Sequence, residues 1–163
     1  MDNNIILKQG DVLAYKGDKN SPISEAVKFM TKSQYSHLCL YISDDQAIEA
    51  DGINGDINYV DVNNYKGRLD VYSCLTLTDL QRKQICDYAI SRIGQKYDYL
   101  LLFILFLKRL FKFRFRLRDR KADICSELVN DSYKEANVIL SRKKYPSPQE
   151  VIESKLLRYI GSY

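Results

Sequence analysis

The chain has 163 residues, a length that suits one domain able to bury about two-thirds of its unfolded surface. Hydrophobic residues make up 45% of it and charged residues 28%, as is typical of a soluble globular protein. The longest apolar run, residues 99–107, is too short for a transmembrane helix, and residues 1–7 lack the pattern of a signal peptide. We therefore expect one domain over residues 1–163, located in the cytoplasm and carrying an insert at about 99–121.

The cysteines and the histidine argue against a metal centre or a disulfide framework. None of the four cysteines forms a CxxC pair, and His37 has no second histidine with which to complete a zinc site. Cys39, Cys74 and Cys86 each lie in an apolar segment, where cysteine is usually a small buried hydrophobic residue. We expect no metal, no cofactor and a reducing compartment.

The first half of the chain predicts one helix among several strands. Residues 11–15 read as a short strand, and Ser21-Pro22 opens a helix with serine as the N-cap and proline in the first turn. Residues 37–42 and 46–50 predict a hairpin around the acidic turn 43–45. Two further strands are predicted at 57–62 and 69–75.

The second half of the chain predicts mainly helices. Thr78 to Gln81 matches a capping box, and the helix that starts there should end near Gly94. The residues expected on its buried face are Ile85, Tyr88, Ala89 and Ile93. Residues 124–136 predict a second helix, and Ser147-Pro148 starts a short final one. This order of elements predicts an α+β domain with an antiparallel sheet.

Cys125 and His37 are the candidates for nucleophilic chemistry. Cys125 lies at the predicted start of a helix, where the free N–H groups favour a thiolate. His37 is the only histidine, so any imidazole base must be this residue. Taken separately, each is more often a structural residue, because most helix cysteines are buried and most lone histidines are solvated or hydrogen-bonded.

Glu49 is the candidate for orienting the imidazole from the neighbouring strand. A two-residue turn would place it opposite Leu40, on the wrong face of the sheet. A three-residue turn is expected to place it opposite Tyr41, on the His37 face but several residues away, so that a bulge or strong twist must close the gap. Asp51 is the alternative for the same role.

Several short segments occur in an order that is similar to a known family: Gly10–Val12, Ser36–Ile42, Ile48–Ala50, Gly94–Asp98, Cys125–Val129 and Ser147–Pro148. The order resembles the circularly permuted branch of the NlpC-type papain-like cysteine hydrolases, the YiiX/YebB-like group, which is related to the lecithin:retinol acyltransferase group. In this branch the histidine strand precedes the cysteine. The resemblance covers roughly residues 10–150 and implies a permuted papain-like fold, with a sheet or partial barrel packed against helices and the nucleophile at a helix N-terminus.

The resemblance also implies roles for individual residues. Cys125 would be the nucleophile, His37 the base and Glu49 the third polar member, while Tyr35 and Asp98 would lie at the substrate-binding site. The chain departs from the family at Cys39, where a small residue, commonly glycine, is usual.

Three functions are compatible with these residues. The first is a cysteine hydrolase that cleaves amides in peptides, including cell-wall-derived ones, and the second is a lipid-directed thiol acyltransferase or esterase. The third is a non-catalytic binding module that has kept the fold. The expected partner is thus a peptide or acyl substrate.

The insert concentrates the positive charge of the chain. Residues 108–121 hold eight Lys or Arg and one Asp, a net +7, so the rest of a chain with net charge +4 carries −3. Residues 111–118 alternate apolar and basic side chains behind the apolar run 99–107. The segment could be a buried helix followed by a solvated strand, or it could bind an anionic membrane surface. Nucleic-acid binding is disfavoured, because no recognition motif accompanies the charges.

Overall fold

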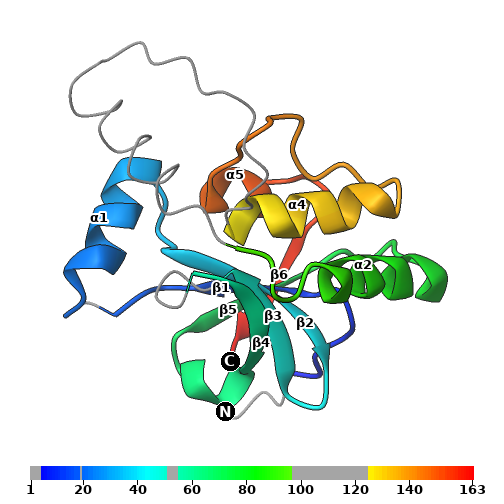
Figure 1. The fold of residues 1–163 in the computed structure, drawn as a ribbon, viewed down its shortest axis with the longest axis horizontal. Coiled ribbons are helices and arrows are strands. Elements are labelled where there is room, and N and C mark those ends of the chain that lie inside the picture. Colours follow the sequence, from blue (N-terminus) through cyan, green and yellow to red (C-terminus); the bar gives the residue numbers. More distant parts are fainter. Residues whose placement is uncertain (1–4, 19, 51–54, 97–124) are drawn as a thin grey trace.

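A computed structural model describes residues 5–18, 20–50, 55–96 and 125–163. Six antiparallel strands form one sheet in the order β4-β3-β2-β1-β5-β6 (Figure 1). The strands are β1 (Val12–Tyr15), β2 (His37–Ser43), β3 (Gln46–Ala50), β4 (Ile57–Asp61), β5 (Leu69–Ser73) and β6 (Arg158–Ser162). The helices are α1 (Pro22–Thr31), α2 (Asp79–Ser91), α4 (Cys125–Glu135) and α5 (Pro148–Ile152), with a short 3-10 helix η1 (Val62–Tyr65). The predicted α+β class with an antiparallel sheet is confirmed.

The two faces of the sheet bury two separate clusters. On one face, Leu38 and Leu40 pack with Ile85 of α2 and Leu128 of α4, which lie side by side in Figure 1. On the other face, strand residues pack with the η1 region and the chain ends; the buried members are Leu13, Cys39, Ala47, Val62, Leu69 and Val71. Because side chains alternate along a strand, His37 shares the second face with Cys39.

The helix starts follow their capping residues. Ser21, Thr78 and Ser147 each accept a hydrogen bond from a backbone N–H in the first turn, and Thr78 and Ser147 complete capping boxes. The inward face of α2 differs in part from the expected one. Its buried residues are Arg82, Ile85, Cys86 and Ala89, whereas Ile93 lies beyond the end of the helix and is 36% exposed.

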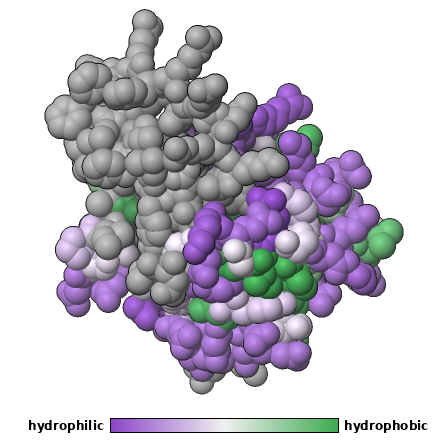
Figure 2. Space-filling model, viewed as in Figure 1, coloured by the Kyte–Doolittle hydropathy of each residue, from purple (hydrophilic) through white to green (hydrophobic). Residues whose placement is uncertain are grey.

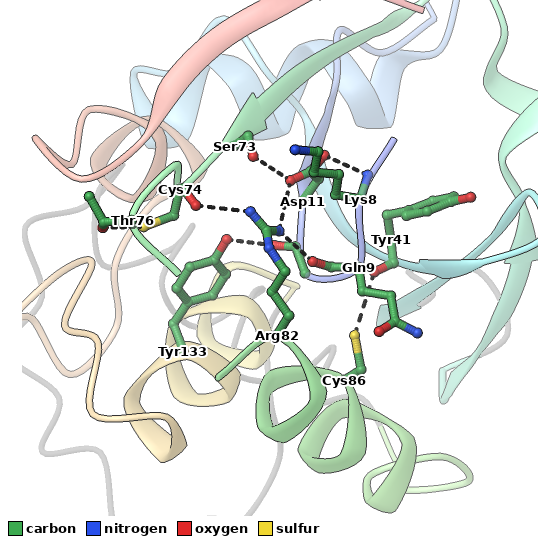
Figure 3. A network of polar contacts seen from close by, with 11 residues as sticks. Lys8, Gln9, Asp11, Tyr41, Ser73, Cys74, Thr76, Arg82, Cys86 and Tyr133 are labelled. Atoms are coloured by element: carbon green, nitrogen blue, oxygen red, sulfur yellow. Dashed lines mark hydrogen bonds and ion pairs between the residues drawn. The ribbon is translucent and has the colours of Figure 1, made fainter. Parts of the chain in front are cut away.

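The buried Arg82 explains why this face of α2 departs from an apolar stripe. Figure 3 shows its guanidinium reaching into the segment that precedes β1, where Nη1 donates to the Gln9 carbonyl over 2.6 Å. Nη2 donates to the Cys74 carbonyl over 3.1 Å, and Asp11 Oδ1 lies 3.4 Å from Nη1. Ser73 Oγ also donates to Asp11, over 2.6 Å. Every charge in this network is paired, so Arg82 joins α2 to the segment before β1 and to the end of β5.

Among the residues that the structure describes, β6 is the one strand that is not predicted from the sequence. It pairs with β5, and a register shift between Val71 and Tyr72 interrupts the ladder. Its side chains are mostly exposed, including Tyr159 at 55% and Ile160 at 43%. An edge strand exposed on both faces lacks the alternation of apolar and polar residues by which a strand is recognised.

The surface of the described part is mostly hydrophilic on the side shown in Figure 2, with hydrophobic side chains gathered in small areas. All four cysteines are buried and free, as expected for a chain without a disulfide framework. No helix within the described ranges is both long and apolar enough to cross a membrane. Asp51, Asp98 and the insert at 99–121, with its basic segment 108–121, lie outside the described residues.

Candidate active site

Glu49 lies on the same face of the sheet as His37. The β2–β3 ladder pairs Glu49 with Cys39, two residues along the strand from His37. Both expected registers, which placed Glu49 opposite Leu40 or opposite Tyr41, are therefore wrong. The observed register brings the carboxylate nearer to the imidazole than either of them.

A bulge in the hairpin produces this register. Asp44 and Asp45 form a two-residue turn in which both have positive φ, 49° and 59°, as the favoured tight hairpin turn requires. Ser43 pairs with Gln46 beside the turn, but the next pair is Tyr41 with Ala47. One extra residue of β2 is thus accommodated, which shifts every later pair by one and moves Glu49 to the His37 face.

The Glu49 carboxylate accepts hydrogen bonds from three side chains, two in β2 and one in η1. Its Oε2 lies 2.9 Å from His37 Nε2 and accepts from the Cys39 thiol over 3.4 Å. The Tyr65 hydroxyl of η1 donates to both oxygens, over 3.1 and 3.0 Å. Burial raises the pKa of Glu49, but the hydrogen bond and charge of His37, with the other donors, outweigh burial and lower it. Glu49 is therefore a carboxylate at neutral pH.

Cys125 is the first residue of α4, and two buried hydrogen bonds fix the helix. Ser126 Oγ donates to the Pro146 carbonyl over 2.6 Å, immediately after the cysteine. Two turns later, Tyr133 donates to the carbonyl of Gly10 over 2.5 Å (Figure 3). The start of α4 is thus attached to the segment before α5, and its last turn to the segment before β1. Cys125 itself is 6% exposed.

The Cys125 thiol interacts with the His37 ring through a hydrogen bond and through charge. Burial raises the pKa of Cys125, but the positive charge of His37, a hydrogen bond with its ring and the backbone N–H groups of Leu38 and Ser126 together lower it. Burial lowers the pKa of His37, but the negative charges of the Cys39 and Cys125 sulfurs raise it well above its ordinary value. Because Nε2 faces Glu49, Nδ1 is the ring nitrogen left for Cys125.

Cys39 is close to the same imidazole but differs in its ionisation. Burial raises the pKa of its thiol to about 12, although the nearby charge of His37 opposes that shift. Cys39 is therefore protonated at neutral pH, and its S–H donates to Glu49. Of the two thiols, Cys125, whose pKa is lowered, is therefore the one that ionises more readily beside His37. The pKa values of the two thiols next to one imidazole are thus shifted in opposite directions.

The remaining predicted residue, Tyr35, belongs to another polar cluster. It is 1% exposed, and its hydroxyl donates to Asp70 over 2.7 Å and lies 2.8 Å from the Tyr72 hydroxyl. Its role in substrate binding stays a prediction, as does that of Asp98. Tyr65, in contrast, contacts the candidate site directly but was not predicted, because it lies in a polar segment, 63–67, that reads only as a turn.

No family model matches the sequence, and no curated protein matches it. The fold does match a solved structure, described as the metalloprotein yiiX from Escherichia coli O157:H7. The TM-score is 0.60 at 19% sequence identity, over 96% of this chain and 97% of that one. This likeness shows a YiiX-like fold for nearly the whole chain, in agreement with the group that the sequence resembles.

Proposed function

We propose that the protein is a cysteine hydrolase that cleaves an amide bond through a thioester intermediate. The observation that carries the proposal is the chain of contacts from Cys125 through His37 to Glu49, with Cys125 at the first turn of α4. In such a chain of contacts the thiol is the nucleophile, the imidazole is the base, and the carboxylate orients the imidazole.

In the first half-reaction the Cys125 thiolate attacks the amide carbonyl carbon and forms a C–S bond. Backbone N–H groups at the start of α4 stabilise the negative charge that develops on the carbonyl oxygen. His37 then donates its Nδ1 proton to the leaving nitrogen as the C–N bond breaks. The products are a free amine, a neutral imidazole and a thioester on Cys125.

In the second half-reaction the neutral His37 accepts a proton from water at Nδ1, and the water oxygen attacks the thioester carbonyl. Breaking the C–S bond releases a carboxylic acid and restores the thiolate beside the imidazolium. Throughout the cycle Glu49 accepts the hydrogen bond from Nε2, which keeps Nδ1 directed at the reacting atoms.

Peptide amides, including those of cell-wall-derived peptides, are the substrate class that we propose from the resemblance to the NlpC-type hydrolases. The support for the hydrolase over a binding module is the lowered pKa of Cys125, since a purely structural buried thiol would have a raised one.

The direct test uses an activated ester, p-nitrophenyl acetate, as the acyl donor. Mixing it with the protein should give a burst of nitrophenolate with an amplitude of about one per chain, followed by slower turnover. Mass spectrometry of the quenched protein should locate the acetyl group on Cys125. Cys125→Ser should lose the burst, whereas the matched control Cys86→Ser should keep it. Acetylation spread over several cysteines, or a burst that survives in Cys125→Ser, would exclude the proposed mechanism.

A further inference from the structure

Three unlike side chains, one of them the His37 imidazole, lie close together on the face of the sheet away from Leu38. His37, Cys39 and Glu49 each offer one ligand atom, and these nitrogen, sulfur and oxygen atoms all lie within 4.8 Å of one another. In the described part of the chain, this is the group of histidine, cysteine and acidic side chains with the spacing of a metal site. The proposed hydrolysis requires His37 and Glu49 but makes no use of Cys39.

We propose that His37, Cys39 and Glu49 form an inhibitory site for a thiophilic divalent cation of the Zn²⁺ class. Zn²⁺ takes nitrogen, sulfur and oxygen ligands in tetrahedral geometry, which separates the donor atoms by roughly 3.3–3.6 Å. His37 Nε2 and Glu49 Oε2 are 2.9 Å apart, and Cys39 Sγ and Glu49 Oε2 are 3.4 Å apart. These two pairs need to move by only a few tenths of an ångström, and the His37–Cys39 pair has to close from a separation of at most 4.8 Å, for the three ligands to hold the ion.

Charge balance favours a divalent ion at this point. A Cys39 thiolate, a Glu49 carboxylate and a neutral His37 carry two negative charges, which a divalent cation neutralises. The surroundings are poor in water, because Cys39 is 1% and Glu49 5% exposed, so local neutrality is important. Tyr65 donates to the Glu49 carboxylate and would continue to orient it as a ligand. Three protein ligands leave a fourth position for water.

Metal binding and the proposed hydrolysis exclude each other, and this part of the inference rests on the proposed function. The cation takes the lone pair of His37 Nε2, and the protons of Nε2 and of the Cys39 thiol pass to solvent. The ring is then neutral, with its remaining proton on Nδ1. It can neither hold a positive charge beside Cys125 nor accept a proton from water. Zn²⁺ should thus suppress the reactivity of Cys125 without contacting its sulfur.

Cobalt spectroscopy tests the site independently of any activity. Co²⁺ added to the metal-free, fully reduced protein should give a near-ultraviolet thiolate-to-cobalt band that saturates at one ion per chain. Cys39→Ser should lose this band, and Cys39→Ala serves in its place if the serine variant fails to fold. Cys125→Ser should keep it, as should the control Cys86→Ser. A wild-type protein without the band, or its loss in Cys125→Ser, would overturn the proposal.

Zinc inhibition tests the consequence, with iodoacetamide labelling of Cys125 as the readout and a phosphine as the reductant. At a free Zn²⁺ concentration ten times the Kd, occupancy predicts a roughly tenfold fall in the labelling rate of the wild type. In Cys39→Ser, the ratio of the rates with and without zinc should stay within about twofold of one. Equal inhibition of both proteins, or faster labelling with zinc, would refute the inhibitory role. A Cys125 that is unreactive even without metal would instead refute the hydrolase, while the cobalt band still reports on the site.

Discussion

Glu49 lies directly opposite Cys39 in the β2–β3 ladder, and its carboxylate oxygen contacts both the Cys39 thiol and the His37 ring. A carboxylate in this position serves two chemistries that compete for one imidazole. With a proton on Nε2, it supports His37 as the partner of the Cys125 thiolate. With a cation there, the same carboxylate becomes a ligand. Cys39 distinguishes the two, because only the second arrangement uses its sulfur.

The first prediction is that iodoacetamide at pH 7 labels Cys125 faster than the other cysteines. The pKa of Cys125 is lowered, whereas those of Cys39 and Cys86 are raised to about 12 and about 11. At pH 7, a pKa of about 12 leaves roughly one thiol in 10⁵ ionised. Peptide mapping at short reaction times identifies the labelled residue. The Cys125 rate should also fall less between pH 8 and 6 than that of a free thiol, and preferential labelling of Cys39 would refute the assignment.

The second prediction is that His37→Gln slows the labelling of Cys125 at pH 7 by at least about tenfold, since each unit of thiol pKa changes the thiolate fraction tenfold. Glutamine can form hydrogen bonds but supplies no positive charge to the sulfur. Tyr41→Phe, on the same face of β2, is the matched control and should label at the wild-type rate. The difference between the two variants should shrink as the pH rises, because hydroxide then deprotonates the thiol of His37→Gln without the imidazole. If His37→Gln is labelled at the wild-type rate at pH 7, the imidazole does not activate the Cys125 thiol.

The sequence predicts those elements whose signals are local. Ser21, Thr78 and Ser147 are found at the helix starts that their side chains specify, and β2 and β3 flank the acidic turn around which the hairpin is predicted. The pairing of Cys125 with His37 could be expected only from the resemblance, because the two residues are 88 positions apart and no local pattern joins them.

Other features depend on geometry that single residues do not encode. The position of Glu49 follows from a bulge next to a tight turn, and the sequence of the turn is compatible with several registers. The expected absence of a metal site rested on the lack of a second histidine and of CxxC spacing. The hairpin brings together a nitrogen, a sulfur and an oxygen donor from residues 37, 39 and 49, a set that no short motif describes.

The third prediction concerns the insert, for which we propose binding to an anionic membrane surface. Residues 108–121 carry a net +7, and each basic residue near a charged bilayer contributes on the order of 1 kcal/mol. Replacing Arg114, Arg116 and Arg118 together with Glu should abolish co-sedimentation with phosphatidylserine vesicles and leave the labelling of Cys125 unchanged. Salt should weaken the wild-type interaction. A wild-type protein that ignores such vesicles even at low salt would refute this proposal and leave the insert as a packing segment.

The last prediction is that Glu49→Gln lowers the free energy of unfolding near neutral pH by roughly 1 kcal/mol and that the difference disappears in acid. The pKa of Glu49 is lowered in the folded protein, despite the opposing effect of burial, by its hydrogen bond with His37 and the other donors. A group of this kind stabilises the fold fully above its unfolded pKa, near 4.5, and loses that contribution as the pH falls through the lower folded value.

Chemical denaturation at a series of pH values measures this effect. The curves of wild type and Glu49→Gln should be separated at pH 6–7 and converge only once the pH falls below the lowered pKa of the folded Glu49, where the wild-type carboxyl is protonated as well. The exposed Glu153 provides the matched control, and Glu153→Gln should follow the wild-type curve throughout. A gap that stays constant down to low pH would mean that Glu49 stabilises the protein by packing and neutral hydrogen bonds, and that its charge does not support the imidazolium.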